Sequence, residues 1–372
     1  MINIILQNSN LIELIFFSTL GIFLFAAYLN KKDKKMDYYV FITFLSFILI
    51  LFHSIVFSFE PLKSSIDSIL AILKLSTLYL IIKITKQKNI QSAIKLFFMF
   101  LSIITILPSN ILLLLGQREN FTVDGNFKSI FSNANMFAMY LSIFVYPYIL
   151  YLDKFFKRFL WGKYFYYFLN FNIFYLILIS GSRINLVLFI IASIFFYLND
   201  EKKGFQFQSL PKIISIFSLS GIFIFVFLNE FFMGFIFKGQ LSIFTTRIPL
   251  WIARLNAISE KPLFGWGYNV NEFYFYNKYN VFNELEKGST VLAIIEEFGV
   301  FLGIFFIIVF VLVFYNAFKQ YLKTPNTHYI GLIILLVPFH LIVETWILNF
   351  NSLFALFIWF IIFNVLELKH EQ

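Results

Sequence analysis

Three arginines in this sequence stand where they could bind an anion. Arg247 and Arg254 are seven residues apart, so on a helix with 100° per residue their side chains lie on nearly the same line. Arg183 follows the tripeptide Ser-Gly-Ser at 180–182 and opens a hydrophobic run. A cation at the start of a helix opposes the helix dipole and is stabilised by an offsetting anion. These arginines are therefore candidate anion ligands.

Carboxylates and histidines inside hydrophobic runs form a second group of candidates. His340 and Glu344 are four residues apart, which predicts that they stack on one face of a helix. Glu296 and Glu297 lie about two turns into another run. Ionisable side chains inside a membrane are costly to bury and are functional candidates for that reason.

Three further ionisable residues have a structural interpretation. Asp67 and Lys74 are seven residues apart in one run, which favours a neutralising ion pair. His53 lies in another run, where a hydrogen-bonded core histidine is the expected role rather than a ligand.

Several kinds of chemistry find no support in the sequence. It contains no P-loop, no GxSxG, no HExxH and no Asp-x-Asp pair. It has no cysteine, which excludes thiol catalysis and disulfides, and its four scattered histidines predict no metal site. We therefore expect neither a metal nor a cofactor.

The composition decides the class of protein that must position these residues. Of the 372 residues, 60% are hydrophobic, 13% are charged and 56 are Phe. The mean hydropathy is +0.82. Soluble domains carry about 25% charged residues, so this chain cannot cover a water-facing surface. The sequence predicts an all-α, polytopic membrane helix bundle with the lipid bilayer as a partner.

About 11 hydrophobic runs are long enough, or nearly so, to cross a bilayer as helices. They lie near 11–29, 39–59, 66–82, 94–115, 133–151, 164–181, 184–199, 212–229, 289–315, 329–346 and 348–366.

Lysine and arginine concentrate in alternate loops and so predict the orientation of the bundle. Basic residues in short loops stay in the cytoplasm. The basic loops lie near 31–35, 83–95, 154–163, 202–212 and 319–323, with Lys369 in the tail. The N-terminus is therefore expected outside and the C-terminus in the cytoplasm. The net charge of +9 is mainly this topology signal, and no nucleic acid is expected as a partner.

One long connection interrupts the pattern of short loops. We expect spans 1–8 in residues 1–229, an outer-face loop in 230–288, and spans 9–11 with a cytoplasmic tail in 289–372. A loop of this length is typically functional.

The long loop contains a predicted amphipathic helix near 246–259. Its expected apolar face consists of Ile248, Trp251, Ile252, Leu255 and Ile258. Such a helix would lie in the outer membrane interface and hold its two arginines at phosphate depth. An alternative interpretation assigns both arginines to lipid headgroups, and Arg183 to the ordinary basic end of a span.

Five short motifs, in this order and on the predicted outer side, resemble the O-antigen polymerase and O-antigen ligase superfamily. They are Phe131-x-Asn133-x-Asn135, Ser180-Gly181-Ser182-Arg183, Arg247-x3-Trp251, Pro262-Leu263-Phe264-Gly265-Trp266-Gly267 and Glu297-x-Gly299.

The resemblance implies glycosyl transfer outside the bacterial cytoplasmic membrane. The donor would be a glycan on undecaprenyl diphosphate, the enzyme inverting and metal-independent, and a chain-length regulator a further partner. By matched position, Arg183 and Arg247 would bind the pyrophosphate, and Arg254 joins them by helical geometry. Fixed guanidinium groups suit the charge that develops on a leaving pyrophosphate.

One departure from the family concerns the general base. The histidine that the ligases carry in the outer loop corresponds here to Gly288. Glu297, or the pair His340 and Glu344, is then the candidate base, since a partly buried carboxylate suits that role. A structural role for Glu297, in a helix hydrogen bond or a salt bridge, stays open.

The resemblance favours a polysaccharide repeat-unit polymerase, serving lipopolysaccharide O-antigen, capsule or another exopolysaccharide. The alternative within the family is a ligase that transfers the glycan to lipid A core. From another class, a lipid-linked oligosaccharide flippase would show repeated halves and midplane charges. The sequence shows no repeat, and only Lys74 lies clearly at mid-membrane depth.

Overall fold

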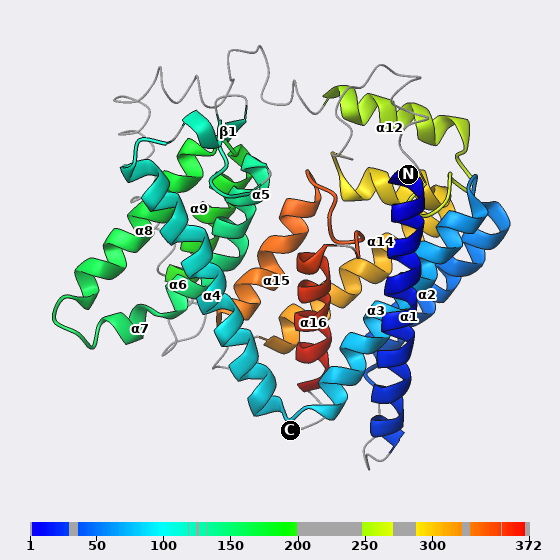
Figure 1. The fold of residues 1–372 in the computed structure, drawn as a ribbon, viewed down its shortest axis with the longest axis horizontal. Helices are drawn as coiled ribbons and strands as arrows, with labels where there is room; N and C mark the ends of the chain where they lie inside the picture. The colour runs from blue at the N-terminus through cyan, green and yellow to red at the C-terminus, as the bar shows by residue number, and fades with distance from the viewer. Residues whose placement is uncertain are drawn as a thin grey trace. The chain divides into compact units, whose positions relative to one another are not determined.

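The protein is built almost entirely of helices (Figure 1). The computed structural model describes residues 2–29, 36–117, 119–123, 126–131, 133–198, 248–270, 288–321, 328–350 and 352–368. The chain divides into two compact units: Met1–Gln91, Thr246–Lys323 and Leu341–Gln372 form the first, and Ser92–Thr245 with Thr324–His340 form the second.

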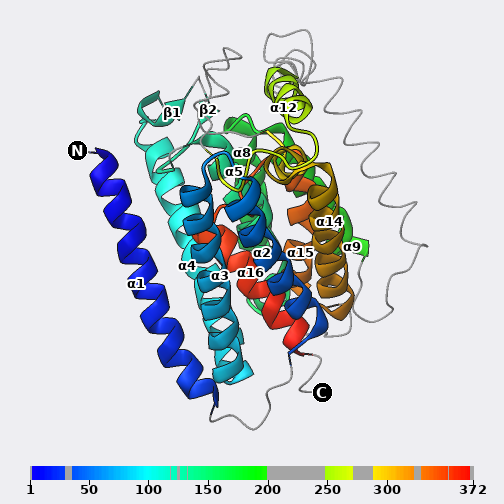
Figure 2. The ribbon, with the colours of Figure 1, turned by 90° about the vertical axis from the view of Figure 1, so that its right-hand side faces the viewer.

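The first unit is a bundle centred on α3. Helices α1, α2 and α16 run along α3, as Figure 2 shows, and α14 packs against α2, α16 and α12. Their bounds are α1 Ile2–Leu29, α2 Tyr38–Phe57, α3 Pro61–Ile84, α12 Ile248–Glu260, α14 Thr290–Tyr321 and α16 Leu353–Glu367.

The second unit packs its helices against a buried central segment. That segment, Ala134–Tyr151, consists of α5, a π-helical stretch and α6 in direct succession, and it is largely buried. The elements are α4 Gln87–Leu114, η1 Glu119–Phe121, β1 Thr122–Val123 paired antiparallel with β2 Asn126–Phe127, α5 Ala134–Met139, η2 Tyr140–Val145, α6 Tyr146–Tyr151, α7 Asp153–Phe156, α8 Gly162–Ile179, α9 Arg183–Leu198 and α15 His328–Leu341.

The described helices make this a multi-pass membrane protein of the all-α class, as expected. Six segments are long and apolar enough to cross a bilayer: α1, α2, α3, α4, Ala134–Tyr151 and α14. Helices α9, α15 and α16 are apolar but shorter. Every predicted run except the eighth overlaps a described helix, although α8, over the sixth run, is not among the helices apolar enough to cross a bilayer. The eighth run, 212–229, lies outside the described residues.

Several polar groups of the helices are satisfied locally, as an apolar solvent favours. Asp37 caps α2 by accepting from the Tyr39 N–H at 2.8 Å, and Pro61 opens α3, where no N–H is needed. Serine and threonine hydroxyls donate back to the carbonyl four residues earlier, as Ser68 does to Ser64 at 2.7 Å.

Helix α14 is broken at Gly299, whose φ of 74° and ψ of 176° are not helical. Glycine adopts a positive φ without strain from a side chain. The break frees the carbonyls of Glu296 and Glu297 and the N–H of Val300, and each unsatisfied group in a bilayer costs several kcal/mol. These three groups are bonded by the loop 262–267.

The loop replaces the missing helical hydrogen bonds one by one. The N–H groups of Trp266 and Gly267 donate to the carbonyls of the two glutamates at 2.9 and 2.8 Å, and the carbonyl of Pro262 accepts from Val300 at 2.8 Å. The approach leaves no room for a side chain. A Cβ on Gly265 would lie 2.5 Å from the Gly299 nitrogen.

We predict that Gly299→Ala destabilises the protein severely. The added Cβ would lie 2.1 Å from the Leu263 carbonyl oxygen. The loss in free energy of unfolding should exceed the roughly 1–2 kcal/mol of a left-handed alanine alone. Thermal unfolding of the purified protein in detergent measures it.

Two glycines provide matched controls for this substitution. Gly116 has a φ of +67°, and an added Cβ would meet no heavy atom of the described residues within 4 Å, so Gly116→Ala isolates the backbone strain. Gly21 is helical and its added Cβ meets only Thr77 Oγ1 at 3.9 Å, so Gly21→Ala should be neutral or stabilising. If Gly299→Ala lowers the free energy of unfolding no more than Gly116→Ala does, the loop does not pack tightly against the break in α14.

Candidate functional site

Helix α12 packs against α14, and most of the predicted apolar face stays outside that contact. The expected face included Ile252 and Leu255, but these are 52% and 54% exposed. The side chains buried instead are those of Leu250, Ala253, Arg254 and Ala257. Small alanines permit close helix approach, and one of the buried residues is charged, which apolar periodicity does not anticipate.

Arg254 forms a buried ion pair with Glu296 of α14. Its Nη1 lies 2.7 Å from Oε1 and 2.8 Å from Oε2, and the two side chains are 5% and 6% exposed. Arg254 is therefore buried against α14 and not exposed at the edge of an apolar face, as the sequence predicted. A buried guanidinium is stable here because its counter-charge is in contact with it.

Two tryptophans hold α12 in place: Trp266 joins it to the loop Pro262–Gly267, here called the glycine loop, and Trp251 joins it to the residues before α14. The Nε1–H of Trp251 donates to the carbonyl of Gly288, and that of Trp266 donates to the carbonyl of Ala257, each at 2.9 Å. Trp266 packs with Ala257 and Val270 in a small apolar core. The glycine loop thus holds both α12 and the broken helix.

His53 also holds the glycine loop. Its Nε2 lies 2.5 Å from the carbonyl oxygen of Phe264, and the Phe57 ring stacks on the Phe264 ring with centroids 4.2 Å apart. His53 is buried. The expectation of a hydrogen-bonded core histidine is confirmed.

Asp67 and Lys74 have different partners, so the predicted ion pair between them is wrong. Lys74 Nζ donates to Glu13 Oε2 at 2.6 Å, and Asp67 Oδ2 accepts from Asn269 Nδ2 at 2.7 Å. Glu13 lies on α1. The spacing of Asp67 and Lys74 on α3 could not predict this partner, because Glu13 belongs to another helix.

Glu297 is buried and lies near Tyr268. Burial, together with the negative charges of Glu297 and Asp67, raises the pKa of the Tyr268 phenol well above its usual value. The phenol therefore stays protonated and donates to the carbonyl of Leu348 at 2.7 Å. Glu297 thus belongs to one electrostatic cluster with Asp67 and Tyr268, all within the first unit.

In the second unit, Asn185 joins the two motifs that lie there. Its Oδ1 accepts from Ser142 Oγ at 2.7 Å, and its Nδ2 lies 2.8 Å from Ser182 Oγ and 3.4 Å from the Asn135 carbonyl. Asn185 is fully buried, two residues after Arg183, which opens α9 and is partly exposed.

The same network fixes the start of α5 and reaches a distorted turn. The side chain of Asn133 caps α5, accepting from the N–H of Asn135 at 2.6 Å. Ser142, which donates to Asn185, lies in the π-helical stretch Tyr140–Val145. Such π-helical turns are rare in proteins, and many of those known lie at functional sites.

The predicted stacking of His340 and Glu344 on one helix face is wrong. Helix α15 ends at Leu341, soon after Pro338, whose missing N–H and ring weaken a helix interior. Glu344 is buried in the following coil, where its carbonyl accepts from Thr290 Oγ1 at 2.7 Å. His340 is buried at the helix end in the second unit.

Arg247, the other predicted anion ligand, lies outside the described residues. Among the residues that are described, no three His, Asp or Glu side chains gather in a metal-binding group. No protein-family model matches the chain, and no curated protein matches its sequence.

Two contacts of this site are not predicted from the sequence. Glu296 was a candidate only through its depth, and its role as counter-ion of Arg254 depends on a contact across 42 residues of chain. The pair of Asp67 with Asn269 spans 202 residues. The one sign of the Arg254–Glu296 pair in the sequence is that no acidic residue lies within four residues of Arg254.

We predict that Glu296→Gln lowers the free energy of unfolding by about 3–5 kcal/mol, because it leaves the Arg254 guanidinium buried without a counter-charge. Arg254→Met should cost a similar amount. The double variant Arg254→Met/Glu296→Met should lose much less than the sum. Glu296→Met alone completes the cycle, and detergent unfolding of the wild type, the two Met single variants and the double variant measures the coupling.

The matched control is Lys63→Gln in the solvent-exposed pair with Glu60, whose side chains are 42% and 36% exposed. That change should alter stability by at most about 1 kcal/mol. Additive losses in the double variant would contradict a coupled buried pair.

Proposed function

We propose that the chain is a polysaccharide repeat-unit polymerase. It would transfer a glycan from undecaprenyl diphosphate to the non-reducing end of another lipid-linked repeat unit. The reaction would take place on the outer face of the bacterial cytoplasmic membrane, with the N-terminus outside and the C-terminus in the cytoplasm, in a bundle of about 11 spans.

One observation carries this proposal: the glycine loop Pro262–Gly267, the fourth of the five motifs, is bonded directly to the Glu297-x-Gly299 motif. Motifs that are only weakly specific in sequence thus meet in one place. In the second unit, Asn185 connects the Ser-Gly-Ser-Arg motif to Asn135 in the same manner. These hydrogen-bonded contacts between motifs support the interpretation that the motifs are parts of functional sites.

The proposed chemistry assigns a role to each group. A hydroxyl of the acceptor sugar attacks the anomeric carbon of the donor, and its proton passes to the Glu297 carboxylate. The bond from that carbon to the diphosphate oxygen breaks, and the diphosphate leaves with the electron pair. Attack opposite the leaving group inverts the anomeric centre.

The arginines would stabilise the leaving diphosphate. Arg183 and Arg247 take this role by their motif positions. Arg254 takes it with its guanidinium held in place by Glu296, which acts in this proposal as a positioning residue. His340 and Glu344 remain alternative bases to Glu297.

The glycine at the position where the ligases carry a histidine favours the polymerase over the ligase. Gly288 has a φ of +72°, a conformation that side chains rarely adopt, and an added Cβ would lie 3.3 Å from Leu250 Cβ. A histidine at this position would be strained. The backbone here suits the glycine that the sequence has.

The experiment that tests this proposal supplies purified protein with lipid-linked repeat units. We expect a ladder of lengthening glycans, and binding without elongation would refute a polymerase. A product that forms only when lipid A core is added would identify a ligase. Movement of the substrate across vesicles without elongation would identify a flippase.

Variants test the assigned roles. Arg183→Ala and Arg247→Ala should abolish the ladder while thermal unfolding stays unchanged, and Glu297→Gln should slow it by about 10²–10⁴-fold. Arg158→Ala is the control, because Arg158 is exposed in a loop predicted to face the cytoplasm. Full activity of both arginine variants would refute the pyrophosphate assignment.

A further inference from the structure

The chain between α7 and α8 forms a tight corner within residues 153–163, here called the α7–α8 corner. The N–H groups of Phe159 and Gly162 donate to the carbonyls of Phe156 and Phe159 at 3.1 and 3.0 Å. Gly162 is buried, and a Cβ added to it would lie 1.9 Å from the Phe156 carbonyl oxygen. Backbone contacts therefore fix this corner, which leaves its large side chains available to a partner.

Large apolar side chains project from the α7–α8 corner. Leu160 is 86% exposed, Trp161 75% and Phe159 56%. Apolar surface of this extent is costly to leave in water, and contiguous exposed apolar residues mark interaction sites. The corner therefore favours a partner with an apolar part.

The same corner is basic. Residues 153–163 contain four basic residues and one acidic residue, a net charge of +3. The side chain of Lys157 is 54% exposed although its Nζ lies 2.5 Å from Asp153 Oδ2. Lys163 is also exposed, with its Nζ 5.9 Å from the centre of the Tyr167 ring. The partner should therefore carry negative charge as well.

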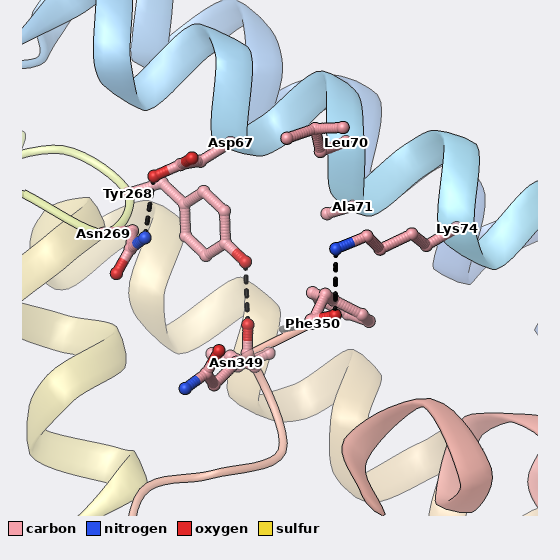
Figure 3. Close-up of a pocket in the computed structure, with 9 residues that line it drawn as sticks. Asp67, Leu70, Ala71, Lys74, Tyr268, Asn269, Asn349 and Phe350 are labelled. Carbon is pink, nitrogen blue, oxygen red and sulfur yellow. Dashed lines mark hydrogen bonds between the residues drawn. The ribbon is translucent and has the colours of Figure 1, made fainter. Parts of the chain in front are cut away.

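Two charged residues of the first unit provide a contrast. Lys74 donates to the Phe350 carbonyl at 3.3 Å, and Asp67 accepts from Asn269 at 2.7 Å, as Figure 3 shows. These two charges hold segments of the protein together. At the α7–α8 corner the basic side chains are exposed instead, so their charge acts on the surroundings.

The place of the corner in the chain identifies those surroundings. It directly follows Ala134–Tyr151, a segment long and apolar enough to cross a bilayer, and so lies where a span ends. Apolar groups are costly in water and cations are costly in hydrocarbon, but the headgroup layer between them accepts both. Tryptophan and tyrosine are enriched at this depth.

We propose that the α7–α8 corner is a binding surface for anionic phospholipids. Leu160 and Trp161 insert at the level where the acyl chains begin. Lys157 and Lys163 lie at the phosphates, and the net positive charge selects anionic headgroups over neutral ones. This surface goes beyond the proposed function, because it uses none of the residues assigned to glycosyl transfer.

The absence of cysteine from the chain allows a direct measurement of lipid contact. Leu160→Cys is labelled with bimane, and the protein is placed in nanodiscs made of equal parts phosphatidylcholine and phosphatidylglycerol. Bromine on the acyl chains quenches bimane on contact, and it is carried by one lipid or by the other in two otherwise identical samples. The ratio of quenching measures the preference for the anionic lipid. Phe159→Cys is the second reporter if Leu160→Cys does not fold.

Leu62→Cys is the matched control position. Leu62 is apolar and 77% exposed, as Leu160 is, but the charges beside it cancel, because Lys63 and Glu60 form an ion pair at 3.6 Å. A label at this position should be quenched equally by the two brominated lipids.

At Leu160→Cys we expect brominated phosphatidylglycerol to quench about twofold more than brominated phosphatidylcholine, or better, since each basic residue near an anionic surface favours it about fivefold. Adding Lys157→Gln/Lys163→Gln should remove most of this preference without changing thermal unfolding. High salt should also reduce it, because salt screens exposed charges.

Two results would overturn the proposal. One is equal quenching by both lipids at Leu160→Cys, or a preference that Lys157→Gln/Lys163→Gln leaves unchanged. The other is a label that neither lipid quenches, which would place the corner in water or against another protein.

Discussion

The arrangement of the first unit depends on the break in α14 at Gly299. A break in a membrane helix exposes backbone groups that lipid cannot satisfy, so another segment must bond to them. The glycine loop supplies those bonds and leaves no space for a Cβ at Gly265 or Gly299. Because the loop also bonds to α12 through Trp266 and to α2 through His53, one backbone defect determines where three helices meet.

Around this break, buried charges are handled as pairs from distant segments. Arg254 is neutralised by Glu296 across the contact between α12 and α14, and Lys74 by Glu13 across that between α3 and α1. A buried ion pair contributes little net stability over apolar packing, yet removing one partner is severely destabilising. Such pairs therefore tie helices together in one arrangement. Asp67 is only partly buried and has the amide of Asn269 as its partner.

In the second unit, neutral polar groups connect the helices in place of ion pairs. Asn185 bonds to Ser142, Ser182 and the Asn135 backbone, so one fully buried amide connects α9 to the central segment Ala134–Tyr151. The π-helical turn widens the backbone there, and Arg183 opens α9 beside this network. In the proposed function, rigid support of this kind holds a guanidinium ready for a diphosphate without reorganisation during the reaction.

The sequence by itself determined the class of protein, the position of most helices and the residues whose chemistry is unusual, because hydropathy and helical periodicity are local properties. It also singled out the glycine loop and Glu297-x-Gly299 as motifs. Their contact, the burial of Arg254 and the separate partners of Asp67 and Lys74 were decided by tertiary structure. Side chains pair according to distance in space, and 42 or 202 residues of intervening chain carry no periodic signal of that distance. The face of α12 that packs against α14 has the same cause, since Arg254 is buried there against Glu296.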